Sequence, residues 1–380
     1  MNPFIYGEIV TAGAFTDREA ERDKLVADLG AGQKVFLISP RRYGKSSLIR
    51  HVMQRLARDR VLTVEITVAA SSSYVSFLEA YAQALVTAET PVGRLRRWVS
   101  ELLHAVRPEL RLDTDVTGET SVALGFPTVR TARDTSRLAA EVFALPGRIA
   151  AARKQRVAVA LDEFQAIAAF DSGTVEHALR AAVQTQRDVG YVFAGSEPSL
   201  MERMLEPRRP FYKAGPVMRL EKIDTATFAA FIEARFTASG IKPQEDLGVA
   251  IVELAGNVPF DVQRLAHETW DDVKAAGRRT AGVDDLHRSL TRLLGEQNTM
   301  FEEAWQRLTL GQRGVLRALV LENGREILSA DVRARHRLPG TSSVQSALAA
   351  LTRQDIIMKE EGRYLVTDSL YREWIARRTY

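Results

Sequence analysis

One loop near the start of this 380-residue chain limits its possible folds more than any other feature. The apolar run Lys34–Ile38 has the character of a buried strand. It leads into Ser39-Pro40-Arg41-Arg42-Tyr43-Gly44-Lys45-Ser46, and a helical pattern then continues to about Arg58. A strand, a loop ending in Gly-Lys-Ser and a helix are the setting of a P-loop, in which backbone N–H groups and a helix N-terminus point at phosphates. The loop therefore predicts a P-loop fold that binds a nucleoside triphosphate.

The residues of the loop have separate expected roles. A glycine before the lysine is needed because the backbone passes close to the β-phosphate, and Gly44 provides it. Lys45 should reach the β- and γ-phosphates, and Ser46 should ligate Mg²⁺. Ser39 stands where the consensus has its first glycine, and a serine with negative φ can turn there, so we treat it as a variation. The expected nucleotide-binding residues of the loop are Ser39, Pro40, Arg41, Arg42, Tyr43, Gly44, Lys45, Ser46 and Ser47.

An acidic pair ends a second apolar strand. Asp162-Glu163 follows Val157–Leu161, which is the arrangement of a Walker-B motif. Asp162 should hold Mg²⁺ through water, and Glu163 should act as the general base on the attacking water. Taken alone, the pair is also compatible with exposed acids at a strand–loop junction. The two motifs in this order, on two strands, favour a nucleotide site over a chance Gly-Lys-Ser turn.

Two further positions are weaker candidates for catalysis. Ser196 follows the strand Tyr191–Ala194, where a polar residue can contact the γ-phosphate or position water. The alternative for Ser196 is a helix cap, because Glu197-Pro198 follows at once. Arg208 and Arg209 come after the next helix, where an arginine can reach a neighbour's γ-phosphate in a homo-oligomer. A solvated basic turn is the favoured alternative for this pair.

Periodicity divides the chain into three expected domains. Residues 1–221 alternate near-continuous apolar strands with helices, which predicts a parallel sheet covered by helices on both faces. Within it, the polar stretch of about 108–133 is expected to be an insertion that forms a hairpin. Residues 222–297 carry only helical patterns and predict an all-helical lid. Residues 298–380 predict a winged helix-turn-helix from three helical patterns followed by two short strands.

The predicted winged helix leaves DNA binding open. Its third helix, residues 343–353, offers only a thin polar set, and a stronger basic cluster lies on the preceding helix at Arg333, Arg335, His336 and Arg337. Glu360 and Glu361 on the wing would repel phosphate. The alternative is a domain that docks on a protein partner or on the rest of the chain.

Composition narrows the class of protein without naming a substrate. The chain has no cysteine, which excludes disulfides, thiolate zinc sites and cysteine nucleophiles, and the cytosol (a cytoplasmic location) is therefore the default. No stretch reaches the roughly 18 consecutive apolar residues of a membrane span, and a signal peptide is not expected. A net charge of +4 is compatible with DNA contact but does not argue for it.

Beyond single motifs, the chain resembles a known family. The segments that carry the resemblance are Asn2-Pro3-Phe4, Phe15 to Glu21, Ser39 to Leu48, Asp162-Glu163-Phe164-Gln165, Ala194-Gly195-Ser196, Gly256-Asn257-Val258-Pro259 and Leu370 to Trp374. They are similar to the archaeal-type ATPases, which are AAA+-related P-loop proteins placed with the STAND ATPases. The resemblance implies an ATP-binding core, a helical lid and a winged-helix C-terminus.

The resemblance also implies roles for three residues outside the two motifs. Phe15 and Arg18 would lie near the adenine or ribose, and Pro259 would touch the base from the lid. From the residues alone, without the resemblance, Phe15 is expected to be a core residue, Arg18 a residue of a helix's first turn and Pro259 the start of a helix. Three hypotheses for the chain follow: a Mg²⁺-dependent ATPase that works as a nucleotide-driven switch, a DNA-binding regulator in which nucleotide is structural, and a protein-interaction scaffold.

Overall fold

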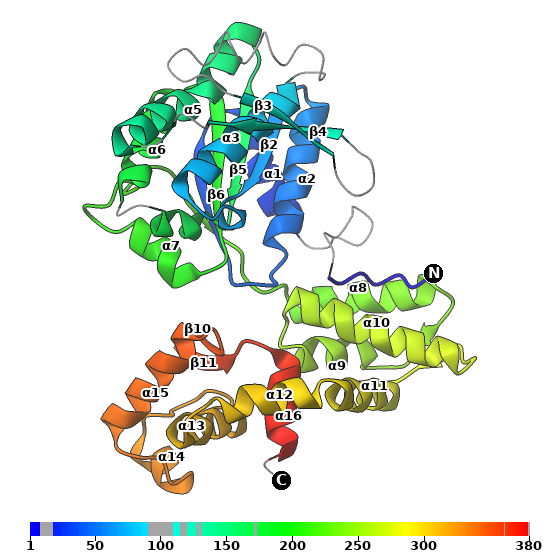
Figure 1. The fold of residues 1–380 in the computed structure, drawn as a ribbon. Coiled ribbons are helices and arrows are strands. Elements are labelled where there is room, and N and C mark those ends of the chain that lie inside the picture. The colour runs from blue at the N-terminus through cyan, green and yellow to red at the C-terminus, as the bar shows by residue number, and fades with distance from the viewer. Residues whose placement is uncertain are drawn as a thin grey trace. The chain divides into compact units, whose positions relative to one another are not determined.

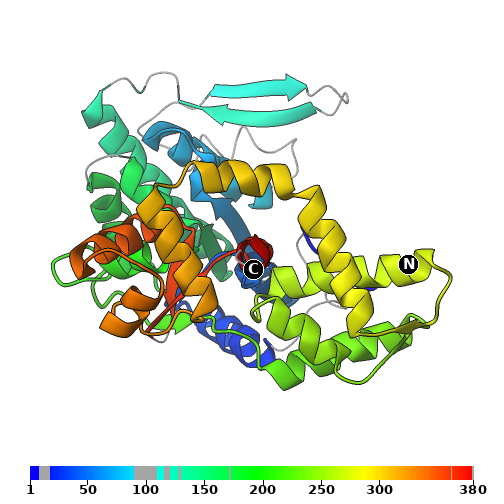
Figure 2. The ribbon, with the colours of Figure 1, turned by 90° about the horizontal axis from the view of Figure 1, so that it is seen from below.

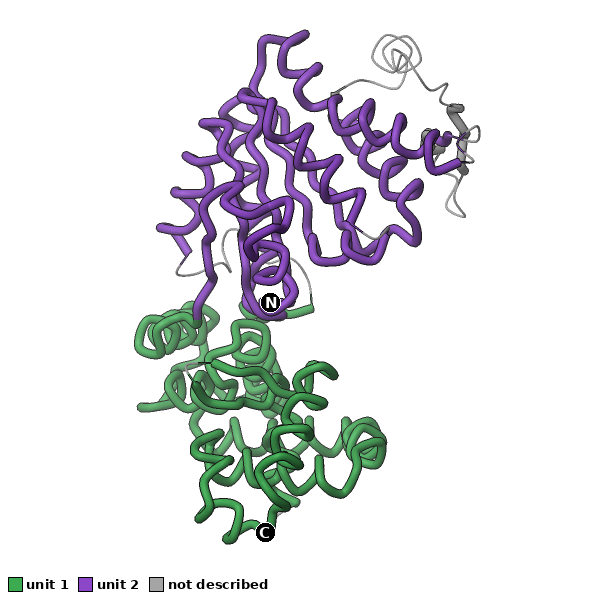
Figure 3. The backbone as a smooth tube through the Cα atoms, turned by 90° about the vertical axis from the view of Figure 1, so that its left-hand side faces the viewer, with its two compact units in different colours: residues 1–8, 222–380 green, residues 9–221 purple. Residues whose placement is uncertain are grey.

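The computed structural model describes residues 1–7, 18–89, 109–114, 120–126, 129, 131–170, 173–360 and 362–378. These residues form two compact units (Figure 3). One unit is Ile9–Glu221, and the other combines Met1–Glu8 with Lys222–Tyr380. None of the described helices combines the length and the apolar composition needed to cross a membrane.

A five-stranded parallel sheet forms the centre of the Ile9–Glu221 unit. Its strand order is β2-β5-β6-β1-β7. The strands are β1 (Lys34–Ile38), β2 (Leu62–Thr67), β5 (Val157–Asp162), β6 (Val189–Gly195) and β7 (Val217–Arg219). Because all five run the same way, the P-loop after β1, the acids after β5 and Ser196 after β6 leave the sheet at the same edge. The predicted parallel sheet is confirmed.

Helices cover both faces of this sheet, as the apolar strands require (Figure 1). One face packs against α1 (Glu19–Gly30) and α2 (Lys45–Arg58). The other packs against α3 (Tyr74–Glu89), α5 (Ala132–Arg153) and α6 (Thr174–Thr185). Strand β5 shows the cause, since Ala158 and Ala160 join the first core while Val157, Val159 and Leu161 join the second.

The predicted hairpin in the insertion is present as two paired strands. β3 (Glu109–Thr114) and β4 (Thr120–Gly125) pair antiparallel, and they appear in cyan in Figure 2. Among the described residues, this unit also has three short helical elements: η2 (Val68–Ala70), η4 (Phe164–Ala169) and α7 (Pro198–Met204). The last two begin two and three residues after the ends of β5 and β6.

Four helices begin the C-terminal unit after residue 222. They are α8 (Thr225–Ala238), α9 (Leu247–Leu254), α10 (Pro259–Ala275) and α11 (Val283–Glu296). The expectation of an all-helical lid is wrong in one detail, because β8 (Lys242–Pro243) pairs in parallel with β9 (Thr280–Ala281). Lys242 and Gln244 donate backbone hydrogen bonds to the carbonyls of Arg279 and Ala281, at 2.8 and 2.7 Å. The pair satisfies the backbone of two adjacent interhelical loops.

The remaining elements follow the order expected for a winged helix. They are α12 (Asn298–Gln306), α13 (Leu310–Leu321), α14 (Ala330–Arg335), α15 (Thr341–Arg353), β10 (Ile357–Glu360), β11 (Arg363–Val366) and α16 (Ser369–Arg378). β10 and β11 pair antiparallel as the wing. Helix α15 starts two residues before the expected Ser343, since Gly340 is its N-cap. One continuous apolar core runs from α8 to α16. We keep the division of this unit into residues 222–297 and 298–380 as a proposal.

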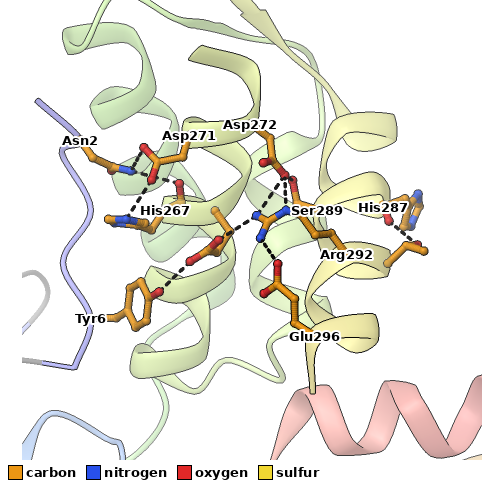
Figure 4. A network of polar contacts seen from close by, with 11 residues as sticks. Asn2, Tyr6, His267, Asp271, Asp272, His287, Ser289, Arg292 and Glu296 are labelled. Atoms are coloured by element: carbon orange, nitrogen blue, oxygen red, sulfur yellow. Dashed lines mark hydrogen bonds and ion pairs between the residues drawn. The ribbon is translucent and has the colours of Figure 1, made fainter. Parts of the chain in front are cut away.

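The first residues of the chain pack on the helices of the C-terminal unit. We call residues 2–6 the N-terminal strap. Phe4 is 1% exposed, and its ring centroid lies 4.9 Å from that of Phe236. Asn2 donates to Asp271, and Tyr6 donates to Glu268 at 2.6 Å (Figure 4). A segment that begins the sequence is thus part of the core formed by the helices after residue 222.

Candidate nucleotide site

The P-loop turns into helix α2 at a glycine. Gly44 is the N-cap of α2 with φ of +83°, a region that glycine adopts without a steric penalty. A Cβ built on Gly44 meets no atom within 4 Å, so the loop is open at this point. Ser39 is buried, and it does not have a positive φ. Its N–H donates to the Gly195 carbonyl at 3.2 Å and its hydroxyl to the Pro40 carbonyl at 3.1 Å. The structure therefore accommodates serine at the consensus glycine position.

The P-loop and the acidic pair meet directly. The Lys45 ammonium contacts the carboxylate of Asp162 and lies 3.2 Å from Oε1 of Glu163. The Ser46 hydroxyl donates to Oδ2 of Asp162 at 2.8 Å. The Lys45 side chain is only 5% exposed, so its charge is held out of water and balanced by these two carboxylates. Residues 117 positions apart thus form one charged cluster.

Glu163 is enclosed by hydrogen-bond donors. Its Oε2 accepts from the Ser196 hydroxyl and, at 2.6 Å, from Nε2 of Gln165. Burial acts to raise the pKa of Glu163, but the donors Ser196 and Gln165 and the charge of Lys45 outweigh it, so that the pKa is lowered. The carboxyl is therefore ionised at neutral pH, as a general base must be.

The structure places Ser196 at the site and not at a helix cap. Ser196 is 5% exposed, and its hydroxyl donates a hydrogen bond to Glu163. The N-cap of α7 is Glu197, which makes no side-chain capping bond but lies 3.4 Å from the guanidinium of Arg41. Within the loop, Tyr43 and Ser47 are buried, while Arg41 and Arg42 are exposed.

The other predicted residues lie as follows. Arg18 is the N-cap of α1, is buried, and binds Glu21 at 2.7 Å and the Glu221 carbonyl. Pro259 is the first residue of α10, in the C-terminal unit. Arg208 and Arg209 are exposed in the turn after α7. Phe15 lies outside the described residues. Contacts of these residues with nucleotide remain predictions.

The donor set fits a magnesium–nucleotide complex. Mg²⁺ favours a few protein oxygens together with phosphate oxygens and water. Ser46 and Asp162 supply two adjacent protein oxygens, 2.8 Å apart, at the end of the P-loop. Across the described part of the chain, no cluster of three or more His, Asp or Glu side chains could hold a metal by itself. The protein oxygens thus suit an ion that also binds phosphate.

Gln165 is the residue of this site to which the sequence assigned no role. It is 7% exposed and lies beside Glu163 and Ser196. The signal available in the sequence was its place in the Asp-Glu-Phe-Gln segment, three residues after Asp162. Sequence spacing alone does not show which way the side chain of a residue after a strand points.

On the predicted winged helix, part of the basic cluster is paired with an acidic side chain. Arg335 and His336 both contact Glu322, at 2.7 Å each, so half of the predicted basic cluster is paired. Conversely, Glu360 on the wing lies 2.7 Å from Lys222, which offsets its negative charge. The expected repulsion of phosphate by Glu360 is thereby reduced.

Comparison with known proteins identifies the fold of this chain. Residues 299–377 match the family model described as "Probable winged helix domain". A Walker-type ATPase of Pyrococcus abyssi matches with a TM-score of 0.61 at 18% identity, over 96% of this chain and 97% of that one. The chain has the fold of an AAA+ P-loop ATPase with a winged helix.

Two structures from Aeropyrum pernix give the same result at lower similarity. The ORC1 protein in complex with DNA matches with a TM-score of 0.52 at 12% identity, over 96% of this chain and 95% of that one. The ORC2 protein in its ADP form matches with a TM-score of 0.51, also at 12% identity, over 96% and 95%. No curated protein sequence matches this chain. At these identities the likeness concerns the fold alone.

Proposed function

We propose that this chain binds ATP with Mg²⁺, hydrolyses it to ADP and phosphate, and works as a nucleotide-driven conformational switch. The observation that carries the proposal is the convergence of Lys45 and Ser46 on Asp162. A lysine and a hydroxyl from a glycine-turned loop, beside a carboxylate at the end of a parallel strand, are the parts that phosphoryl transfer needs.

Each residue then has one task. Lys45 exchanges its contacts with Asp162 and Glu163 for contacts with phosphate oxygens, and the loop Ser39–Ser47 surrounds the phosphates with N–H groups. Ser46 and Asp162 would hold Mg²⁺, which when bound would supply positive charge to offset that of the phosphates. Glu163 accepts a proton from the attacking water, and the Ser196 hydroxyl orients the reacting groups.

Several finer features belong to the same proposal. We place the chain among the archaeal-type ATPases of the STAND group on the sequence segments that resemble them. In that case Phe15, Arg18 and Pro259 contact the base or ribose. A homo-oligomer in which Arg208 or Arg209 completes a neighbour's site, a cytoplasmic location and a lid at residues 222–297 are parts of the proposal that separate experiments must address.

Phosphate release by the purified chain with MgATP tests the central claim. We expect turnover by the parent chain, and a loss of about 100-fold or more in Glu163→Gln with ATP binding retained. The matched control is Glu176→Gln, which removes the same charge from a buried glutamate on α6 of the same unit. Release at the parent rate by Glu163→Gln would show that Glu163 is not the base.

A second candidate function is DNA binding with nucleotide in a structural role. The winged-helix match at residues 299–377 favours it. The pairing of Glu360 with Lys222 reduces the repulsion of phosphate expected from the wing. It predicts duplex binding whose affinity falls steeply with salt, without phosphate release. A scaffold predicts neither activity, and instead a protein partner recovered by pull-down. Measuring phosphate release with and without duplex separates these functions, since stimulation by DNA would join the first two.

A further inference from the structure

Gln165 is buried against the catalytic candidates, and the roles proposed above leave it unused. Its Nε2 donates to Oε2 of Glu163 at 2.6 Å and to the Ser196 hydroxyl at 3.4 Å. Ser196 in turn donates to the same Oε2. Three side chains from the ends of β5 and β6 thus form a closed triangle of hydrogen bonds around one carboxylate oxygen.

The amide of Gln165 is oriented by this triangle. Its Oε1 is buried and has no hydrogen-bond partner among the residues that the structure describes. A reversed amide would point its oxygen at the Glu163 carboxylate, and two acceptors would then face each other. A buried glutamine that leaves its own oxygen unsatisfied to keep its nitrogen on one carboxylate shows that this contact dominates the orientation.

The backbone and the neighbouring residues hold Gln165 in place. Glu163 has a left-handed backbone with φ of 52°, and the short helix η4 starts directly after it. Phe164 anchors this turn in the core, 4.7 Å from the ring of Phe193. A Cβ on Gly195 would lie 2.8 Å from Oε1 of Gln165 and 2.3 Å from the side chain of Met201, so glycine makes room for both side chains.

The two carboxylate oxygens of Glu163 have different hydrogen-bond partners. Oε2 accepts hydrogen bonds from both Gln165 and Ser196, whereas the contact that Oε1 makes among the described residues is with the Lys45 ammonium, at 3.2 Å. Once Lys45 turns to a phosphate, Oε1 is the oxygen left to accept a proton. We propose that Gln165 is a positioning residue that fixes Oε2 of Glu163 and leaves Oε1 as the proton acceptor. This inference rests on the proposed ATPase function.

The test replaces the donor and keeps the shape. Gln165→Met retains the length and burial of the side chain, and Gln165→Glu retains its outline with acceptors only. We expect kcat to fall about tenfold or more in both variants, with the KM for ATP and the binding of MgATP changed less than about twofold. Gln186→Met is the matched control, because Gln186 is also buried in this unit and donates to the Phe143 carbonyl, away from the site. It should lower the melting temperature and leave kcat in place.

A crystal structure of nucleotide-free Gln165→Met provides a readout that does not depend on turnover. In that structure, the Glu163 carboxylate should move so that its Oε2 no longer accepts the hydrogen bond from Ser196. If both Gln165 variants keep the parent kcat, or if the carboxylate stays in place, the positioning role is wrong even though the ATPase stands. If the parent chain releases no phosphate, the proposed function and this inference fall together. A kcat loss equal to that of Gln186→Met would point to general destabilisation and also overturn the role.

Discussion

Replacing Phe4 by alanine should destabilise the C-terminal unit, most of which begins more than 200 positions later, at Lys222. Phe4 is 1% exposed and packs on Phe236 within the core of the C-terminal unit. Truncating a fully buried phenylalanine costs about 3–5 kcal/mol. The N-terminal strap can also detach locally, and the destabilisation then cannot exceed the free energy with which the strap packs on the helices. We therefore expect the free energy of unfolding to fall by about 2–4 kcal/mol.

Urea unfolding followed by tryptophan fluorescence measures this change. Three of the four tryptophans, Trp270, Trp305 and Trp374, lie in the C-terminal unit, so the signal reports mainly on it. Ile5→Ala is the control, since Ile5 is partly exposed and adjacent to Phe4. A loss below about 1 kcal/mol for Phe4→Ala would refute the reasoning, because it would mean that the strap contributes no more than an ordinary chain end.

The structure predicts the outcomes of three further substitutions. Lys45→Met should abolish MgATP binding in titration calorimetry while circular dichroism keeps the parent spectrum; retained affinity would exclude Lys45 as a phosphate ligand. Burial, and then the hydrogen bond to Glu268, raises the pKa of Tyr6 to about 12. The folded pKa lies above the unfolded value of 10.0, so this stabilisation is present below pH 10 and lost between pH 10 and 12. Tyr6→Phe should flatten the alkaline decline in the urea midpoint, and an unchanged decline would contradict it. Ser369→Ala removes a 2.9 Å hydrogen bond to the buried Asp261 and should cost about 1–3 kcal/mol in urea unfolding, which a neutral result would disprove.

Local patterns predicted the elements of the site well. The apolar run at Lys34–Ile38 is β1, and the run before Asp162 is β5, with bounds within one residue of expectation. Such strands are readable because both faces of a parallel sheet are buried, which leaves a continuous apolar run. The winged-helix order after residue 298 was also predictable, and two of its helices, α13 and α14, begin at the polar caps Thr309 and Ser329.

Contacts between distant residues were not predictable in the same way. The pattern of residues 1–6 carries no sign that Phe4 fills a core made by α8 and α10, because burial of one residue depends on elements that are far away in the sequence. The two-residue strands β8 and β9 escaped prediction because their pairing satisfies loop backbone and requires no particular side chains.

The sequence by itself determined the chemistry of the candidate site: which loop turns at a glycine, which lysine and hydroxyl follow it, and which acids end a buried strand. These are local properties, set by residue type and by periodicity along a few residues. The tertiary structure decided which side chains share the site. It brought Lys45 to Asp162 and Glu163 across 117 and 118 positions, and it turned Gln165 inward onto Glu163. The order of strands in the sheet and the left-handed backbone at Glu163 produce that convergence, and neither has a local signature in the sequence.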